Sequence, residues 1–317
     1  MNFLSKGIKG VDNIAVAVRG LNVKFGNFYA VKDVNFSVKS GEIFGFLGAN
    51  GAGKTTTIRV LCGLVVPTSG EVMIDSEYFV KGKESQIKQK VGYMSQKFTL
   101  YDDLSIEENL DFTASLRKIP TEVYLSRKKE LFEFIEFDKD PDIIVSDLPG
   151  GQKQEIALIA SILHDPKIVF LDEPTAGVAP ASRMRFWILV QKLSRAGKTI
   201  FVTTHYMDEA ENCDRIALMR TGELIALDTT ENLKKNTYQE QIYLLTPKDK
   251  RSQKILIDWS EEYFSMFEPY GQHFHAIVKD NVADDDVIRG ISEICHIKKI
   301  EPSLEDVFVK LVEGGNR

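Results

Sequence analysis

Apolar and polar positions along the chain predict strands first and then alternating helices and strands. Residues 15–47 alternate or run apolar, with turn residues at 26–27 and 40–41. This part ends in EIFGFL (42–47), a short apolar strand of the kind that is buried inside a sheet. A glycine-rich stretch follows, and apolar residues at helical spacing then predict a helix over residues 55–64.

Helical periodicity dominates the middle of the chain. It predicts helices over residues 105–119, 121–137 and 154–165. Ser105, with Glu108 three residues later, has the spacing of a capping box, in which each side chain satisfies the other residue's backbone N–H. The first of these helices is therefore expected to open with that cap.

Buried strands return before residue 230. KIVFLDEP (167–174) and KTIFVTTH (198–205) are predicted to be strands on either side of a helix over residues 181–197. A helical turn at 207–214 and a hairpin over 215–228 complete this part. The alternation of strands and helices predicts an α/β fold.

A second, smaller domain is expected beyond a change of composition near residues 233–235. The predicted strands there cover residues 241–246, 265–271, 273–280 and 296–300, and the predicted helices cover 248–259, 284–294 and 303–314. We therefore divide the chain into a first domain over residues 15–230 and an accessory α+β domain over residues 236–317.

The overall composition fits one large and one small hydrophobic core. The 317 residues are 43% hydrophobic and carry a formal charge of −6, without a long basic run. Nucleic acid is therefore not expected as a partner, since neutralising phosphates needs clustered Lys and Arg. The cysteines, Cys62, Cys213 and Cys295, form no CxxC pair and are expected to be buried, reduced thiols.

The sequence contains no apolar run long enough to span a bilayer. The apolar stretch near the N-terminus is short and is interrupted by Asp12 and Asn13, so we do not interpret it as a signal peptide. If the protein works at a membrane, other chains are expected to supply the spans.

The strongest chemical signal is GANGAGKT, which matches G-x-x-x-x-G-K-[ST] between a predicted strand and a predicted helix. Glycines let such a loop curl so that backbone N–H groups point at phosphate oxygens, and the helix start adds a favourable partial charge. Lys54 is expected to neutralise the β- and γ-phosphates, and Thr55 is expected to bind Mg²⁺. The predicted phosphate-binding residues are Gly48, Asn50, Gly51, Gly53, Lys54, Thr55 and Thr56.

An acidic pair ends the predicted strand 167–174. Asp172 lies at the end of the apolar run, where it can hold the metal, and Glu173 beside it can polarise an attacking water as a general base. Such a pair alone is equally typical of a helix-capping cluster. Following a phosphate-binding loop, it indicates nucleotide hydrolysis with Thr55 and Asp172 as metal ligands.

The order and spacing of these motifs over residues 15–230 resemble the nucleotide-binding subunit of an ABC transporter. The resemblance implies a P-loop NTPase core of the ABC type, with an antiparallel β subdomain and a helical subdomain over about residues 97–165. It also implies ATP and Mg²⁺ as cofactors. The expected reaction is direct attack of water on the γ-phosphate, without a covalent intermediate.

Three further residues take roles only through this resemblance. Phe25 matches the aromatic residue that stacks on adenine, and Gln96 matches the glutamine that senses Mg²⁺ and the γ-phosphate. His205 matches the histidine that contacts the γ-phosphate. Catalysis is thus assigned to Glu173, His205 and Gln96, and Gln96 joins Thr55 as a metal ligand.

The resemblance also implies that two subunits pair head to tail, with each ATP between one phosphate loop and the other chain's signature. The signature here is LPGGQKQ, in which Gly150, Gly151 and Gln152 are expected to meet that ATP. Pro149 stands where the family pattern has Ser, and Ala179 stands where it has an Asp that links the two sites. We expect a weakened but working ATPase, because Pro is tolerated at a helix start. A subunit that binds ATP with little or no hydrolysis is the alternative.

Longer stretches, including the ending EPSLEDVFVKLVEG, resemble the ATPase subunits of type-2 ABC exporters. This implies separate permease subunits, a second copy or a paralogous ATPase chain, in some cases a membrane-fusion protein, and a peripheral position on the cytoplasmic face of the inner membrane. Residues 97–103 are expected to dock a coupling helix of the permease. The other alternative, a soluble regulatory ABC ATPase, is disfavoured by the acidic charge and the single cassette.

Overall fold

The computed structural model describes residues 13–97, 100–280, 282 and 284–314. The chain divides into two compact units, Met1–Thr230 and Glu231–Arg317, which are described separately below. All three cysteines are buried and free, as the sequence predicts. Among the described residues, no helix combines the length and the apolar character that crossing a membrane requires.

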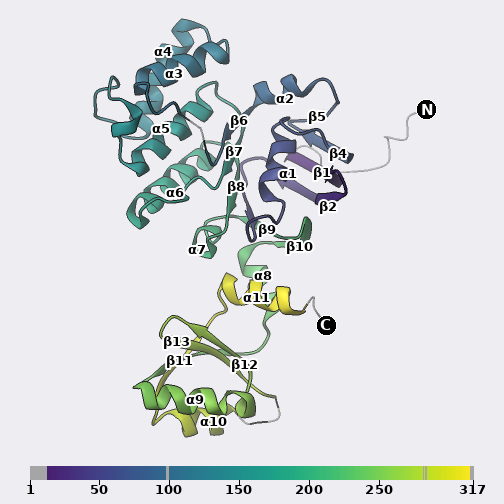
Figure 1. The fold of residues 1–317 in the computed structure, drawn as a ribbon, viewed down its shortest axis with the longest axis vertical. Helices are drawn as coiled ribbons and strands as arrows, with labels where there is room; N and C mark the ends of the chain where they lie inside the picture. Colours follow the sequence, from purple (N-terminus) through teal and green to yellow (C-terminus); the bar gives the residue numbers. More distant parts are fainter. Residues whose placement is uncertain (1–12, 98–99, 281, 283, 315–317) are drawn as a thin grey trace, which may run out of the picture. The chain divides into compact units, whose positions relative to one another are not determined.

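A six-stranded sheet forms the centre of the first unit (Figure 1). Its strand order is β10-β9-β3-β8-β7-β6, and only the pairing of β9 with β10 is antiparallel. The strands are β3 (Ile43–Leu47), β6 (Val91–Met94), β7 (Ile168–Asp172), β8 (Thr199–Thr204), β9 (Arg215–Arg220) and β10 (Glu223–Asp228). Strands β3, β7 and β8 are buried throughout, which explains their continuous apolar sequences. The predicted α/β fold and the predicted terminal hairpin are confirmed.

An antiparallel sheet packs against this centre. Its order is β2-β1-β4-β5, with β1 (Ile14–Phe25), β2 (Phe28–Lys39), β4 (Ser69–Ile74) and β5 (Glu77–Tyr78). The ring of Phe36 on β2 stacks on Phe44 of β3 with centroids 5.4 Å apart, so the two sheets share one hydrophobic core. This is the antiparallel β subdomain that the resemblance implies, although the sequence did not predict β4 or β5.

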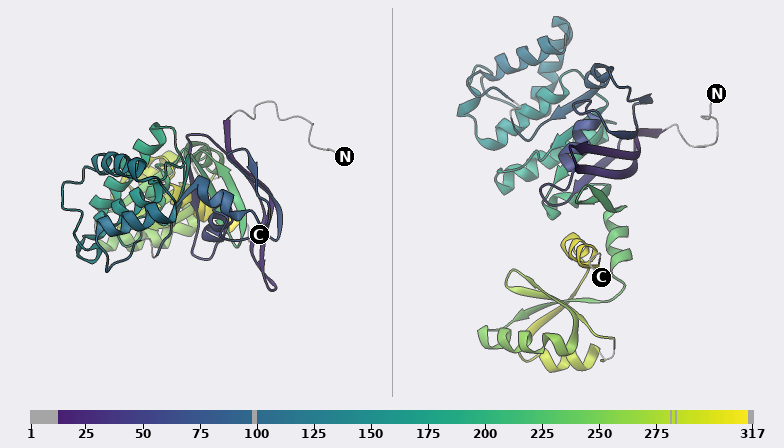
Figure 2. Two further views of the ribbon diagram at one scale, coloured as in Figure 1. Left: turned by 90° about the horizontal axis from the view of Figure 1, so that it is seen from above. Right: turned by 45° about the vertical axis from the view of Figure 1, so that its right-hand side comes forward.

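Helices cover the remaining faces of the first unit. They are α1 (Lys54–Leu61), α2 (Glu84–Lys90), α3 (Ile106–Leu116), α4 (Thr121–Phe134), α5 (Gly150–Ile162), α6 (Pro180–Arg195) and α7 (Met207–Ala210), with the 3-10 turn η2 (Val145–Asp147). Helices α3, α4 and α5 gather at the end of the unit away from β1 and β2 (Figures 1 and 2). The predicted capping box is confirmed, because Ser105 Oγ accepts from the Glu108 amide and the Glu108 carboxylate accepts from the Ser105 amide.

Helix α5 begins earlier than the periodicity predicts. Pro149 is its N-cap residue, and Gly150 and Gly151 form its first turn. A Cβ on Gly151 would lie 2.5 Å from Ser182 Oγ of α6, so the close packing of the two helices excludes any larger side chain there. The sequence prediction of a start at residue 154 was therefore wrong, because the apolar pattern begins only after the glycines.

The second unit has the topology of a split β-α-β fold. After α8 (Thr230–Thr237), the order is β11 (Ile242–Pro247), α9 (Lys250–Tyr263), β12 (Phe264–Tyr270), β13 (His273–Val278), α10 (Asp284–Ile291), β14 (Cys295–Ile300) and α11 (Leu304–Gly314). The sheet order is β12-β13-β11-β14 and every pairing is antiparallel. The predicted strands and helices of this region each correspond to one of these elements.

His164 belongs to none of the sequence motifs. It lies just after α5 and has a structural role. Its Nε2 lies 3.2 Å from the Val91 carbonyl oxygen and donates to it. Burial lowers the pKa of His164 from its ordinary value to about 4. The folded state therefore binds fewer protons than the unfolded state between about pH 4 and pH 6.5, and stability falls as the pH falls through this window.

Replacing His164 by Gln tests this role, because Gln retains a donor for Val91 but does not titrate. We expect the unfolding free energy of the wild type to fall by about 1–3 kcal/mol more than that of His164→Gln between pH 7 and pH 4.5. Urea unfolding at several pH values measures this difference. Parallel pH dependences for the two proteins would contradict the role.

Candidate active site

A cleft of about 440 Å³ in the first unit collects residues from separate parts of the chain. It lies between the β1–β2 turn, the loop before α1, the segment after β6 and the end of β7. The lining residues are Phe25, Phe28, Ala30, Asn50, Gly51, Gly53, Lys54, Thr55, Thr56, Gln96 and Glu173. Phe28 was missed by the sequence analysis. Its position opposite Phe25 across a tight turn was the pattern that would have indicated it as a lining residue.

The loop before α1 has the geometry of an anion cradle. Gly53 is the N-cap residue of α1 and has φ of 106°, and a Cβ there would lie 2.6 Å from the Ala30 carbonyl oxygen. Glycine is therefore required at this position. The helix presents the free amides of its first turn to the cleft, where their partial positive charge favours an anion.

Lys54 is held almost completely out of solvent, with 3% of its side chain exposed. Its Nζ donates to the carbonyl oxygens of Gly48 at 2.8 Å and Ala49 at 3.1 Å. The same nitrogen lies 3.8 Å from Glu173 Oε1. Burial lowers the pKa of Lys54 below its ordinary value, and the charges of Glu173 and Asp172 oppose this shift.

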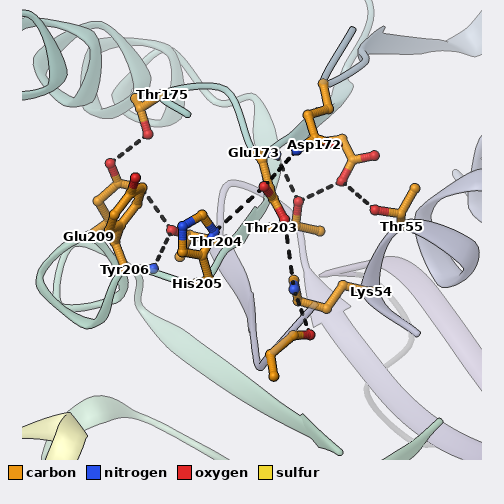
Figure 3. Close-up of polar contacts among 12 residues, drawn as sticks. Lys54, Thr55, Asp172, Glu173, Thr175, Thr203, Thr204, His205, Tyr206 and Glu209 are labelled. Atoms are coloured by element: carbon orange, nitrogen blue, oxygen red, sulfur yellow. Dashed lines mark hydrogen bonds and ion pairs between the residues drawn. The ribbon is translucent and has the colours of Figure 1, made fainter. Parts of the chain in front are cut away.

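Asp172, at the carboxyl end of β7, is surrounded by hydroxyl groups. Its Oδ1 accepts from Thr55 Oγ1 at 3.0 Å and from Thr203 Oγ1 at 2.7 Å (Figure 3). Its Oδ2 accepts from Tyr93 OH at 3.5 Å. Burial, with Asp172 next in effect, raises the pKa of Tyr93 to about 12, so this phenol keeps its proton and remains a donor. Asp172 therefore keeps hydrogen-bond partners although it is 1% exposed.

The donor set around Asp172 fits Mg²⁺. Thr55 Oγ1 and Asp172 Oδ1 lie 3.0 Å apart. Two adjacent oxygen ligands of an octahedral Mg²⁺ are separated by about 2.9 Å. Among the described residues, no group of three or more His, Cys, Asp or Glu side chains forms a metal cage. Mg²⁺ fits such a place, because it usually takes one or two protein oxygens and shares its other positions with water and phosphate.

Glu173 sits where the polar groups of the cleft converge. Its Oε2 accepts from Gln96 Nε2 at 2.8 Å and lies 3.5 Å from His205 Nδ1. Its backbone has a φ of 48°, which a non-glycine residue adopts only when the surroundings hold it there. The approach of His205 is close without being a hydrogen bond, and its buried Nδ1 has no hydrogen-bond partner within the described part of the chain.

A second polar network positions the segment around His205 (Figure 3). Thr175 and Thr204 both donate to the buried carboxylate of Glu209, and Thr204 Oγ1 accepts from the Tyr206 amide at 3.0 Å. The Tyr206 ring packs on the His205 ring, with centroids 4.1 Å apart. Glu209 was missed because a carboxylate on a short helix resembles any solvent-exposed acid in sequence.

The signature residues are not part of the cleft. Gly150, Gly151 and Gln152 form the start of α5, and none of them lines the cleft of this chain. The Gln152 side-chain oxygen accepts from Lys139 Nζ at 2.9 Å on the surface. The structure thus brings together the phosphate loop, the acidic pair, Gln96 and His205, and leaves the signature on a separate surface.

The comparisons with known proteins agree with this geometry. Residues 31–176 match the family model described as "ABC transporter". The probable multidrug ABC transporter ATP-binding protein YbhF of Escherichia coli is 40% identical over 251 residues. That match covers 78% of this chain and 43% of YbhF, so the chain spans less than half the length of this relative.

Other relatives match over most of their own length. The linearmycin resistance ATP-binding protein LnrL of Bacillus subtilis is 38% identical, over 67% of this chain and 69% of that protein. The Nod factor export ATP-binding protein I of a Rhizobium species is 31% identical, over 95% of this chain and 98% of that protein.

Solved structures show the same cassette fold. One is a dimeric post-hydrolysis state of an ATP-binding cassette bound to ADP and Pi, with a TM-score of 0.61 and 27% identity over 68% of this chain and 98% of that chain. An ATP-binding subunit of an ABC transporter has a TM-score of 0.62 and 25% identity over 70% of this chain and 92% of that chain. The resemblance inferred from the motifs is confirmed, and the chain belongs to the family of ABC transporter ATP-binding proteins.

Proposed function

We propose that this chain binds and hydrolyses MgATP as the energy-supplying subunit of an exporter. The observation that carries the proposal is the convergence of Lys54, Thr55, Asp172, Glu173 and His205 around one edge of the central sheet, next to an open cleft. A buried cation, a pair of metal-binding oxygens, a carboxylate and an imidazole are the groups that phosphoryl transfer to water requires.

ATP binding follows from the shape and charge of the cleft. The amides of the phosphate loop and of the first turn of α1 would hold the phosphate oxygens. Lys54 would exchange its loop carbonyl partners for the β- and γ-phosphates. Phe25 would stack on adenine at the far side of the cleft. Thr55 and Asp172 would hold Mg²⁺, directly or through water, and the ion would neutralise charge on the phosphates.

Water attack is assigned to Glu173 as the general base. Its carboxylate faces the cleft and lies within reach of both Gln96 and His205. Gln96 would orient this carboxylate in response to the γ-phosphate. His205, whose ring lies 3.5 Å from Glu173, would contact the γ-phosphate.

A second ATPase chain would complete the site. The amides at the start of α5 are exposed away from this chain's own cleft, where the γ-phosphate of a partner's ATP could meet them. Pro149 cannot donate a hydroxyl hydrogen bond, which is worth about 1.5–3 kcal/mol to a charged acceptor. The Gly150 and Gly151 amides remain, so the proposed dimer is weakened and not lost.

The proposed partners and location follow from the relatives. Multidrug, linearmycin-resistance and Nod-factor-export proteins share this cassette, which supports export by separate permease subunits at the cytoplasmic face of the membrane. Tyr101, within the stretch 97–103, and Phe112 of α3 are both exposed, with ring centroids 5.2 Å apart. This apolar pair offers a contact for a coupling helix.

The first test is steady-state MgATP turnover by the complex purified through a tag on this chain. Glu173→Gln keeps the shape of the side chain and removes the base, so turnover should fall by about a hundredfold or more. ATP affinity should persist, because Glu173 does not bind the phosphates. If wild type and variant both turn over at the same near-background rate, the chain would instead act as a switch that binds ATP without hydrolysing it.

Ala179 provides a second test, because it is the N-cap residue of α6 and makes no side-chain cap. Both Ala179→Asp and Ala179→Asn should raise the unfolding free energy by about 1 kcal/mol through capping. Only the Asp variant restores a carboxylate, so only it should raise turnover. Denaturant unfolding and turnover assays separate the two effects, and equal turnover in both variants would contradict a linking role for the carboxylate.

The third test addresses the permease contact. Asp103 is exposed two residues after Tyr101, and Asp103→Lys should reduce recovery of permease subunits with this chain. Glu71→Lys, an equally exposed reversal on β4, is the matched control and should not affect assembly. Unchanged recovery and unchanged coupling in Asp103→Lys would place the contact elsewhere.

A further inference from the structure

We propose that Thr203 is a positioning residue that holds the two acidic residues of the site in a fixed relation to each other. The inference rests on the proposed hydrolysis and names a residue that no motif identifies. Thr203 lies near the carboxyl end of β8, directly beside Asp172 in the parallel pairing of β7 with β8. Its side chain is completely buried.

The hydroxyl of Thr203 contacts both acidic residues at once, one through its carboxylate and the other through its backbone amide. Its Oγ1 donates to Asp172 Oδ1 at 2.7 Å and accepts from the Glu173 amide at 2.8 Å. A backbone amide can only donate, so the single hydroxyl proton must point at Asp172. The direction of both hydrogen bonds is therefore fixed: the hydroxyl donates to the Asp172 carboxylate and accepts from the Glu173 backbone.

The contact with Glu173 holds an unfavourable backbone conformation. The amide of Glu173 also lies 3.2 Å from the Thr203 carbonyl oxygen, so two oxygens of one residue hold it. Glu173 has a φ of 48°, a backbone conformation that is unfavourable for a residue other than glycine. This conformation sets the direction in which the Glu173 side chain leaves the strand and reaches Gln96.

The contact with Asp172 concerns the proposed metal site. Asp172 Oδ1 accepts from Thr55 as well as from Thr203. Thr55 and Asp172 would hold Mg²⁺, and Thr203 would hold this carboxylate oxygen from the side of β8. One hydroxyl thus links the carboxylate that would hold the metal to the backbone of the residue whose carboxylate would activate water.

The Thr203 hydroxyl can be removed without disturbing the fold. Valine has nearly the same shape as threonine and suits a buried strand. In Thr203→Val the Glu173 amide keeps the Thr203 backbone oxygen, so no buried donor is orphaned. Thr203→Ser restores the hydroxyl. The matched control is Thr199→Val on the same strand, where a buried hydroxyl accepts from the Gly41 amide at 3.0 Å, away from both acids.

The experiment compares these three variants in the complex, which is purified through a tag on this chain. Turnover of Thr203→Val should fall roughly tenfold to a hundredfold through kcat, part of what a general base contributes. Thr203→Ser and Thr199→Val should stay close to wild type. ATP affinity measured in EDTA should be unchanged in all variants, whereas the tightening of ATP binding by added Mg²⁺ should be several-fold smaller in Thr203→Val alone.

Three outcomes would overturn the inference. Thr203→Val could match Thr199→Val in turnover and in the Mg²⁺ effect, Thr203→Ser could be as impaired as Thr203→Val, or ATP binding in EDTA could weaken together with turnover. Glu173→Gln, assayed in parallel, distinguishes a failure of the proposed mechanism of hydrolysis from a failure of the proposed role of Thr203. If Glu173→Gln turns over like the wild type, the proposed mechanism with Glu173 as the general base fails; if it is inactive while Thr203→Val is normal, only the role of Thr203 fails.

Discussion

The parallel pairing of the central strands is the constraint on which the site depends. Leu47 of β3 pairs with Thr204 of β8, and Asp172 of β7 pairs with Thr203. The carboxyl ends of these strands therefore lie at one edge of the sheet. The phosphate loop, the acidic pair and His205 each lie at or just after one of these strand ends. Residues far apart in sequence are therefore brought together by the strand pairing itself.

The same edge is a buried polar region that must be electrostatically balanced. Lys54, Asp172 and Glu173 are all largely removed from water, and an unpaired charge there would be costly. The protein surrounds them with hydroxyl, amide and carbonyl groups instead of with more charges. Threonines at the end of β8 are suited to this task, since their β-branched shape fits the strand and their hydroxyls reach the carboxylates.

Sequence alone predicted the parts of the fold in which local signals agree with tertiary packing. Strands β3, β7 and β8 are buried on both faces, so their continuous apolar runs are unambiguous. The cap of α3 was also predictable, because its two hydrogen bonds involve residues three positions apart. The phosphate loop and the acidic pair were predicted from their residues and spacing along the chain, whereas the role of Phe25 was implied only by the family resemblance.

Other elements depend on contacts that the sequence does not show. Strand β5 is the edge strand of the antiparallel sheet and is exposed, and the first half of its neighbour β4 is exposed too, so their hydrophobic pattern is weak. The first turn of α5 was missed because its glycines are poor helix formers and are retained for reasons outside the helix. Phe28, Thr203 and Glu209 owe their positions to strand pairing and to partners far along the chain.

The two glycines at the start of α5 can be distinguished by this reasoning. Gly151 is required by packing, since a Cβ there would overlap Ser182 of the neighbouring helix. A Cβ on Gly150 would meet nothing within 4 Å, and its backbone does not need glycine's freedom. Glycine inside a helix costs about 1 kcal/mol relative to alanine, so this chain's own fold gives Gly150 no benefit. Its amide is therefore the part of the signature most consistent with close approach by a second molecule, and it remains available whether residue 149 is Ser or Pro.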